Sequence, residues 1–167
     1  CLVGYHDLYT FNAAPAIAEI GRIRSECTYV VLFAHWGNEY KQKQSARQIS
    51  LAHQFIDAGV DLVIGAHPHV VQPVEIYKNK AIFYSLGNFI FDQGLSFWTE
   101  HGLALRVVLS GASNGGSGDG SGDGSTKFTL IPTSLNKSEA SVAGPEDAQK
   151  VLQVTGLGSA EFTLKNE

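Results

Sequence analysis

The sequence predicts an α/β fold with a mixed β-sheet, and two apolar runs with a helical segment between them carry this prediction. Residues 29–34 are a continuous apolar run of β-branched and aromatic side chains, and residues 60–64 are apolar except for Asp61; both are typical of buried strands. The helix between them forms a crossover, so we expect the two strands to run parallel and to end at the same edge of the sheet. A hairpin later in the chain makes the sheet mixed.

The composition fits one globular core and excludes one class of partner. The 167 residues are 44% hydrophobic and 17% charged, and 16 acidic against 12 basic residues give a formal charge of −4. Because the basic residues are scattered and outnumbered, no stripe of them can neutralise a phosphate backbone, and we expect no nucleic-acid partner. No apolar run approaches the roughly 20 residues that span a bilayer.

A strand and a helix are predicted before the first apolar run. Residues 2–5 form the strand, and the helix runs from Asn12, which can cap it, to Glu26. The first turn tolerates Pro15, and the residues spaced for burial are Ile17, Ile20 and Ile23. We expect helices to cover both faces of the strand at 29–34.

The crossover helix has clear start and stop signals. Ser45 and Gln48 have the spacing of a capping box, which predicts the first turn. Gly59 is the expected residue just past the C-terminal end. The apolar residues on the buried face are Ile49, Ala52, Phe55 and Ile56.

A hairpin is predicted after the second apolar run, and further elements follow it. Strands at 74–77 and 81–85 flank a polar connection in which Asn79 can adopt a positive φ. The later elements are strands at 102–109 and 127–131, a flexible Gly/Ser/Asp loop at 111–125 and a short helix at 146–154.

Three histidines are predicted to meet at the C-terminal edge of the sheet, where open α/β sheets bind ligands. His35 ends the first apolar run, and His67 and His69 follow the second. Pro68 fixes its own φ and stiffens the turn between them. Neutral imidazole is a ligand for zinc, manganese and iron, so all three are candidate metal ligands. The alternative is that they are ordinary loop residues.

Two further polar residues near strand ends are candidates for a supporting role. Glu39 can orient a ligating imidazole or contact the substrate, and a solvated acid is the alternative. Asn88 can donate to a phosphate or substrate oxygen, or it can simply form a turn. His6, His53 and His101 are expected to be ordinary histidines.

Four segments carry a family resemblance: His-Trp-Gly-Asn-Glu-Tyr at 35–40, and residues 48–52, 59–70 and 84–92. They resemble the CapA family of bacterial capsule-synthesis proteins, which is similar in fold to calcineurin-like metallophosphoesterases. The resemblance implies that residues 1–135 are the C-terminal portion of a metallophosphoesterase-like α/β sandwich and that residues 136–167 are a tail.

The resemblance also implies a dinuclear metal centre. His35, His67 and His69 would take ligand roles for two divalent ions of manganese, iron or zinc. The family's upstream ligands, which include an Asp-x-His motif and a bridging aspartate, have no match in this sequence. We therefore expect the complete protein to hydrolyse a phosphate ester, with metal coordination generating the nucleophile, and this chain alone to be inactive.

A non-catalytic protein on the same fold, which binds a polymer or assembles the envelope, is the alternative function. The expected partners are a phosphate ester or anionic polymer, the missing N-terminal half of the domain and a capsule-synthesis membrane complex. We expect a location in the cell envelope, through an anchor outside this sequence. Cys1 in place of methionine predicts processing or truncation, and truncation is favoured because a predicted strand follows directly, where a lipidated cysteine would be followed by a polar tether. Cys1 and Cys27 either form a disulfide or stay free thiols.

Overall fold

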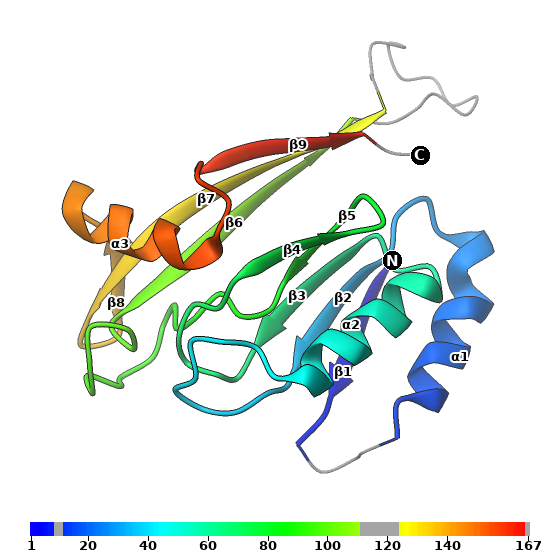
Figure 1. The fold of residues 1–167 in the computed structure, drawn as a ribbon, viewed down its shortest axis with the longest axis horizontal. Coiled ribbons are helices and arrows are strands. Elements are labelled where there is room, and N and C mark those ends of the chain that lie inside the picture. Colours follow the sequence, from blue (N-terminus) through cyan, green and yellow to red (C-terminus); the bar gives the residue numbers. More distant parts are fainter. Residues whose placement is uncertain (9–11, 111–123, 166–167) are drawn as a thin grey trace.

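Two β-sheets face each other in the computed structural model, which describes residues 1–8, 12–110 and 124–165. Two helices cover the outer face of the first sheet (Figure 1). The elements are β1 (Leu2–His6), α1 (Ala14–Ile23), the 3-10 turn η1 (Arg24–Glu26), β2 (Val31–His35), α2 (Ala46–Asp57), β3 (Leu62–Ala66), β4 (Val74–Tyr77), β5 (Lys80–Phe83), β6 (His101–Leu109), β7 (Ser125–Asn136), β8 (Glu139–Val142), α3 (Pro145–Thr155) and β9 (Glu161–Lys165).

The first sheet confirms the predicted mixed α/β architecture. Its strand order is β1-β2-β3-β5-β4, and only β4 runs antiparallel to its neighbour. β2 and β3 are parallel and adjacent, so their C-terminal ends lie at one edge, as the crossover predicted. β1 joins the same edge through parallel pairing with β2. In the hairpin between β4 and β5, Asn79 has a φ of 57°, as expected.

Local signals place α1 and α2 much as the sequence indicates. The Ser45–Gln48 capping box forms in full, and Gly59 follows the C-cap residue of α2 with a φ of 115°. The prediction that Asn12 caps α1 is wrong, because the N-cap residue is Ala13 and no side chain in the described part of the chain caps the helix; Oδ1 of Asn12 accepts only a local hydrogen bond from the amide of Ala14 at 3.0 Å. The α-helix ends at Ile23, three residues earlier than predicted, and continues as η1. Both helices pack on one face of the first sheet.

The expectation that helices cover both faces of β2 is wrong. The opposite face of the first sheet is turned toward an antiparallel sheet in which β7 pairs with β6, β8 and β9. Phe83 of β5 lies 5.8 Å from Phe128 of β7 between ring centroids, and Phe128 stacks on Phe162 of β9 at 4.7 Å. An apolar run indicates burial on both faces, but it does not specify what lies against each face.

The second sheet leaves part of the first sheet uncovered. Its core contacts involve β3 and β5, whereas Leu2 of β1 is 75% exposed and Phe33 of β2 is 47% exposed. An apolar groove of about 570 Å³ runs along this border, lined by residues that include Phe33, His35, Ile64, Leu86, Phe89 and Leu103. The groove therefore reaches the predicted metal site at His35.

The strand that follows the Gly/Ser/Asp stretch is longer than predicted. The predicted loop at 111–125 lies outside the described residues as far as position 123, and β7 already begins at Ser125. β7 continues to Asn136, beyond the strand predicted at 127–131. The helix predicted at 146–154 is confirmed as α3, and β9 after it returns to pair with β7.

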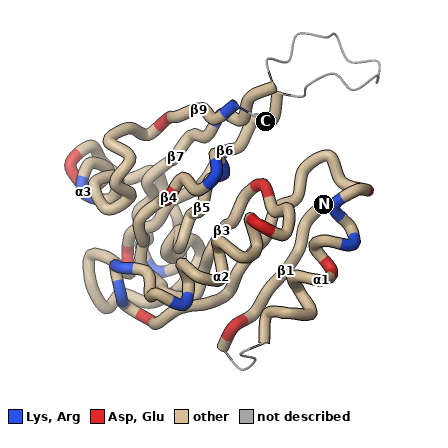
Figure 2. The backbone as a smooth tube through the Cα atoms, turned by 45° about the vertical axis from the view of Figure 1, so that its right-hand side comes forward, with Lys and Arg blue, Asp and Glu red and all other residues tan. Residues whose placement is uncertain are grey.

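Two further sequence questions are answered by the structure. Cys1 and Cys27 form a disulfide, which joins the start of the chain to the segment after η1. Basic and acidic residues are interspersed along the described backbone rather than gathered in one basic stripe (Figure 2). In the part of the chain that the structure describes, no helix is long and apolar enough to cross a bilayer.

Candidate metal centre

The loops that follow β2 and β3 are tied together at the C-terminal edge of the sheet. His35 is the last residue of β2, and the amide of the next residue, Trp36, donates to the carbonyl of Ala66 at 3.1 Å. Further along, the amide of Tyr40 donates to the carbonyl of Pro68 at 2.8 Å. These two hydrogen bonds hold the loop after His35 against the loop that carries the other two predicted histidines.

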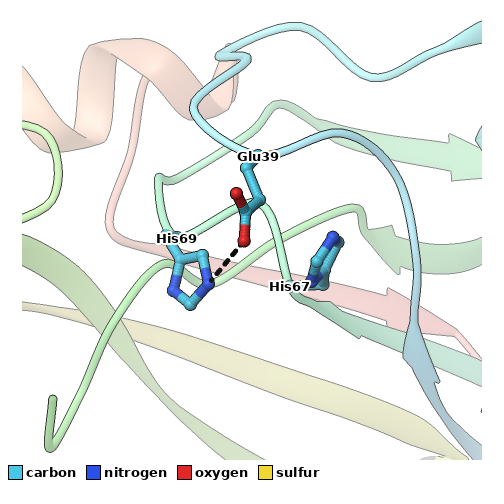
Figure 3. A group of neighbouring side chains, drawn as sticks. All are labelled: Glu39, His67 and His69. Carbon is cyan, nitrogen blue, oxygen red and sulfur yellow. Dashed lines mark ion pairs between the residues drawn. The ribbon is translucent and has the colours of Figure 1, made fainter. Parts of the chain in front are cut away.

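Glu39, His67 and His69 form a cluster with the dimensions of a cation site, which we call the Glu39 cluster. One ligand atom from each residue lies within 4.8 Å of the others. The carboxylate of Glu39 points toward the imidazole of His69, with His67 on its other side (Figure 3). Oε1 of Glu39 is 3.7 Å from Nε2 of His69. This separation is within twice a typical zinc–ligand bond of about 2.1 Å.

His35 lies next to the Glu39 cluster rather than within it. Its imidazole centroid is 4.8 Å from that of His67, and the two rings are tilted by 46°. Desolvation lowers the pKa of His35 below its ordinary value, and the neighbouring imidazoles of His67 and His6 lower it further. Desolvation also lowers the pKa of His67, against the opposing charge of Glu39. Both side chains therefore favour the neutral form that metals bind.

Asn88 fixes the orientation of the His69 ring. The Asn88 side chain is buried, and its Nδ2 atom donates to the carbonyl of Thr99 at 2.9 Å. Its Oδ1 atom must therefore face the Nδ1 atom of His69, which is 2.8 Å away. The proton of this imidazole sits on Nδ1, so the lone pair of Nε2 faces Glu39. Rings of Tyr40 and Phe91 flank His69, with centroids at 6.0 and 5.0 Å.

Three residues around the cluster have a positive φ, which residues other than glycine rarely adopt. Tyr40, His67 and His69 have φ values of 60°, 98° and 61°. Such residues persist only where surrounding contacts hold them, and they gather at functional sites. The backbone is packed closely at Gly65, where a Cβ would lie 2.0 Å from the carbonyl oxygen of Tyr84. That close approach lets the buried indole of Trp36 donate to the same oxygen at 2.9 Å.

A buried amide network supports the loop that carries Glu39. Nε2 of Gln48 donates to Oε1 of Gln72 at 2.9 Å, and Nε2 of Gln72 donates to the carbonyl of Lys41 at 2.7 Å. Gly37 makes room for this network, since its φ is +83° and a Cβ would approach the Gln48 side chain to 2.7 Å. The loop is therefore fixed at both ends.

His6, which sequence reasoning set aside, also lies at this edge. It is the last residue of β1 and the register partner of His35 on β2. Its ring is nearly parallel to that of His35, with an interplanar angle of 4° and centroids 5.2 Å apart. The signal in the sequence was a histidine directly after a predicted strand, the same signal that selected His35. By contrast, His53 pairs with Glu75 on the helix-covered side, and Nδ1 of His101 donates to the Phe97 carbonyl.

The donor set of the Glu39 cluster fits a divalent transition metal. Two imidazoles with one carboxylate are the ligands of many catalytic zinc sites, which keep further positions open for water or substrate. The set also suits manganese or iron.

Comparison with known proteins identifies the family. Residues 5–93, more than half of the chain, match the family model for "Bacterial capsule synthesis protein PGA_cap". The chain belongs to this family. All residues of the Glu39 cluster, together with His6, His35 and Asn88, fall inside the PGA_cap match.

Curated relatives of this PGA_cap chain are bacterial. "Capsule biosynthesis protein CapA" of Bacillus anthracis is 56% identical over 71 residues, 42% of this chain and 16% of the relative. "PGA biosynthesis protein CapA" of Bacillus subtilis is 47% identical over 84 residues, 50% of this chain and 21% of the relative. A "Probable polyglutamine synthesis accessory protein" of Mycobacterium tuberculosis is 34% identical over 88 residues, 50% of this chain and 23% of the relative. The chain thus matches about a fifth of these proteins' length.

Proposed function

We propose that this chain supplies the histidine-bearing half of a metal-dependent phosphoesterase centre in a capsule-synthesis protein. The observation that carries the proposal is the Glu39 cluster, in which one carboxylate and two imidazoles converge at the C-terminal edge of a parallel sheet. The implied fold is the C-terminal portion of a metallophosphoesterase-like α/β sandwich. A bound divalent cation would lower the pKa of coordinated water and neutralise charge on a phosphoryl group.

Each residue at the site has a definite part in this proposal. Glu39, His67 and His69 hold a cation, and His35 extends the ligand set toward the groove. Asn88 holds His69 in the tautomer that presents Nε2. The strained loop between His67 and His69 keeps both rings in place without rearrangement on binding, which is what metal affinity and electrostatic catalysis both require.

A dinuclear centre needs acidic groups beyond those at this edge. Two divalent ions about 4 Å apart repel strongly, and neutral imidazoles do not offset that repulsion. Glu39 is the single carboxylate in the Glu39 cluster. The exposed side chains of Leu2 and Phe33, beside a groove that His35 helps to line, offer a surface against which the rest of the sandwich would pack and deliver those groups.

The test is hydrolysis of bis(p-nitrophenyl) phosphate by the full-length gene product with added Mn²⁺. We expect His67→Ala and His69→Ala to abolish hydrolysis. His53→Ala is the matched control and should retain full activity, because His53 lies on α2 and pairs with Glu75 at 2.8 Å. Hydrolysis that persists in both site variants would contradict the proposal.

A second candidate is a non-catalytic protein that binds the capsule polymer, and the names of the Bacillus relatives favour it because they refer to biosynthesis. The hydrolysis assay, run beside titrations with a divalent cation and with poly-γ-glutamate, separates the two candidates. A full-length protein that binds a cation and poly-γ-glutamate, yet hydrolyses no phosphate ester, would favour the second.

A further inference from the structure

The side chain of Tyr40 forms one wall of the Glu39 cluster. Its ring lies 6.0 Å from the ring of His69 between centroids, at an interplanar angle of 27°. A φ of 60° and the hydrogen bond from its amide to the carbonyl of Pro68 fix its backbone at this place. The side chain is nevertheless 46% exposed, so a molecule that enters the site can contact it.

A chain of hydrogen bonds fixes the role of the Tyr40 hydroxyl. The chain starts at the carbonyl of the buried residue Thr99, which can only accept, and Nδ2 of Asn88 donates to it at 2.9 Å. The second hydrogen of Nδ2 is donated to Oε1 of Gln93 at 3.2 Å. Nε2 of Gln93 is then the atom that faces Tyr40, and it donates to the hydroxyl oxygen at 2.7 Å. The Tyr40 hydroxyl is therefore an acceptor in this chain.

The proton of the Tyr40 hydroxyl is still available for a hydrogen bond of its own. A phenol hydroxyl both accepts and donates, and Gln93 uses only its accepting capacity. Within residues 1–8, 12–110 and 124–165, the Tyr40 hydroxyl donates to no acceptor. A buried carbonyl at one end of the chain thus makes an exposed hydroxyl at the other end a donor.

The same buried amide prepares two neighbouring groups for two different ligands. Oδ1 of Asn88 faces Nδ1 of His69, 2.8 Å away, which leaves the lone pair of Nε2 for a cation. Through Gln93, the Nδ2 atom of the same amide leaves the O–H of Tyr40 for an anion. A phosphoryl group has several oxygens, so one can contact a cation while another accepts a hydrogen bond.

We propose that Tyr40 binds the substrate, with its hydroxyl donating to a non-bridging oxygen of the phosphoryl group, and that Gln93 is its positioning residue. This inference rests on the proposed function and assigns an anion-binding donor to that site. Loss of a hydrogen bond to a charged group weakens binding about 10- to 100-fold. The alternative is that the bond between Gln93 and Tyr40 only ties two loops together. Tyr40 would then matter for the fold and for cation binding, and not for the anion.

The test is calorimetric binding of phenylphosphonate, which has phosphoryl oxygens and cannot be hydrolysed, to the Zn²⁺-loaded and dialysed full-length gene product. We expect Tyr40→Phe to weaken phenylphosphonate binding at least about tenfold and to keep the Zn²⁺ affinity within about twofold, because the ring remains. Tyr77→Phe is the matched control. Tyr77 lies on β4, where its hydroxyl contacts Asp57 at 3.5 Å, and both affinities should stay unchanged.

A second variant tests the direction of the hydrogen bonds. Gln93→Glu replaces the donor that faces Tyr40 with a carboxylate oxygen, which accepts the hydroxyl proton. We expect this variant to weaken phenylphosphonate binding, and we expect Tyr40→Phe to have no further effect in its presence. A new negative charge alone would also weaken binding, but it would leave the effect of Tyr40→Phe intact.

The remaining outcomes decide against the inference in distinguishable ways. If Tyr40→Phe binds phenylphosphonate as the wild type does, or loses Zn²⁺ affinity to the same extent, Tyr40 is not a substrate donor and the proposed function stands. A wild type that binds Zn²⁺ but no phenylphosphonate would likewise overturn the inference alone. A wild type that binds no Zn²⁺ would contradict the proposed function together with the inference.

Discussion

The Oδ1 atom of Asn88 lies 2.8 Å from the Nδ1 atom of His69, and the buried amide that carries it cannot turn around. Its Nδ2 atom is held by the carbonyl of Thr99 and by Oε1 of Gln93, at 2.9 and 3.2 Å. Only one tautomer of His69 satisfies this arrangement, and in that tautomer Nε2 faces Glu39. Asn88 is not itself a candidate ligand, but it determines that Nε2 is the nitrogen of His69 available to a cation.

Replacement of Asn88 should therefore weaken metal binding without removing a ligand. We expect Asn88→Ala in the full-length gene product to lower Zn²⁺ affinity about 10- to 100-fold, as loss of such a supporting group usually does. Calorimetric titration measures the change. Asn136→Ala, at the exposed end of β7, is the control and should leave the affinity unaltered. Equal affinities for the two variants would mean that Asn88 does not orient His69.

Gly65 should be irreplaceable for steric reasons. In Gly65→Ala the new Cβ would lie 2.0 Å from the carbonyl oxygen of Tyr84 and 2.6 Å from the Trp36 indole nitrogen. We expect a loss of about 3 kcal/mol or more in the free energy of unfolding, measured by urea denaturation. Gly21→Ala in α1 is the matched control, because its Cβ would meet nothing within 4 Å beyond the neighbouring backbone of its own helix. It should stabilise the helix by roughly 0.5–1 kcal/mol. Similar effects at both positions would contradict the steric account.

The buried carboxylate of Asp7 should make stability depend on pH. Burial acts to raise its pKa, but hydrogen bonds from Arg47 and Tyr5 outweigh burial and lower the pKa below the ordinary 3.8. Arg47 donates to both carboxylate oxygens at 2.6 Å. A carboxyl group with a lowered pKa in the folded state contributes stability above its unfolded pKa, and this contribution disappears as the pH falls through the folded pKa.

Arg47→Ala should accordingly cost about 1.5–3 kcal/mol of unfolding free energy at pH 7. The difference in unfolding free energy between wild type and variant should become smaller below about pH 4, because the Asp7 carboxyl group becomes protonated in both. Urea denaturation of the two proteins at pH 7 and at pH 3 measures this difference. Arg22→Ala, which removes an exposed pair with Glu19, should have little effect at either pH. A gap of the same size at pH 3 would show that Asp7 is not its source.

The disulfide between Cys1 and Cys27 should stabilise the N-terminal edge of the sheet. It closes a loop with a sequence separation of 26, for which chain entropy gives about 3.5 kcal/mol. We expect Cys27→Ser to lower the free energy of unfolding by an amount of this order. Treatment of the wild type with a thiol reductant should have a matching effect and should leave the variant unchanged. If reductant destabilised the variant equally, the bond would not be the cause.

The convergence of His35, His67 and His69 could be predicted because one short crossover joins the two strands that precede them. A crossover helix with clear caps makes β2 and β3 parallel, and residues that end such strands share an edge. The place of Glu39 could not be predicted in the same way, since it depends on the path of a loop. That path is set by distant hydrogen bonds, such as the one from the Tyr40 amide to the Pro68 carbonyl.

His6 was missed for a related reason. Its position after a strand was visible in the sequence, but the order of strands in the sheet was not, so nothing placed β1 beside β2. The prediction likewise placed helices on the face of β3 and β5 where the structure has an antiparallel sheet. An apolar pattern reports that a face is buried and leaves the covering element to tertiary packing.

The most direct measurement of the central claim is anomalous X-ray scattering at the zinc edge from crystals of the full-length gene product soaked in Zn²⁺. We predict an anomalous zinc peak that lies about 2.0–2.2 Å from a ligand atom of each of Glu39, His67 and His69, with Nε2 as the ligating atom of His69. A zinc peak elsewhere with these three side chains uncoordinated, or no peak at saturating Zn²⁺, would contradict the account.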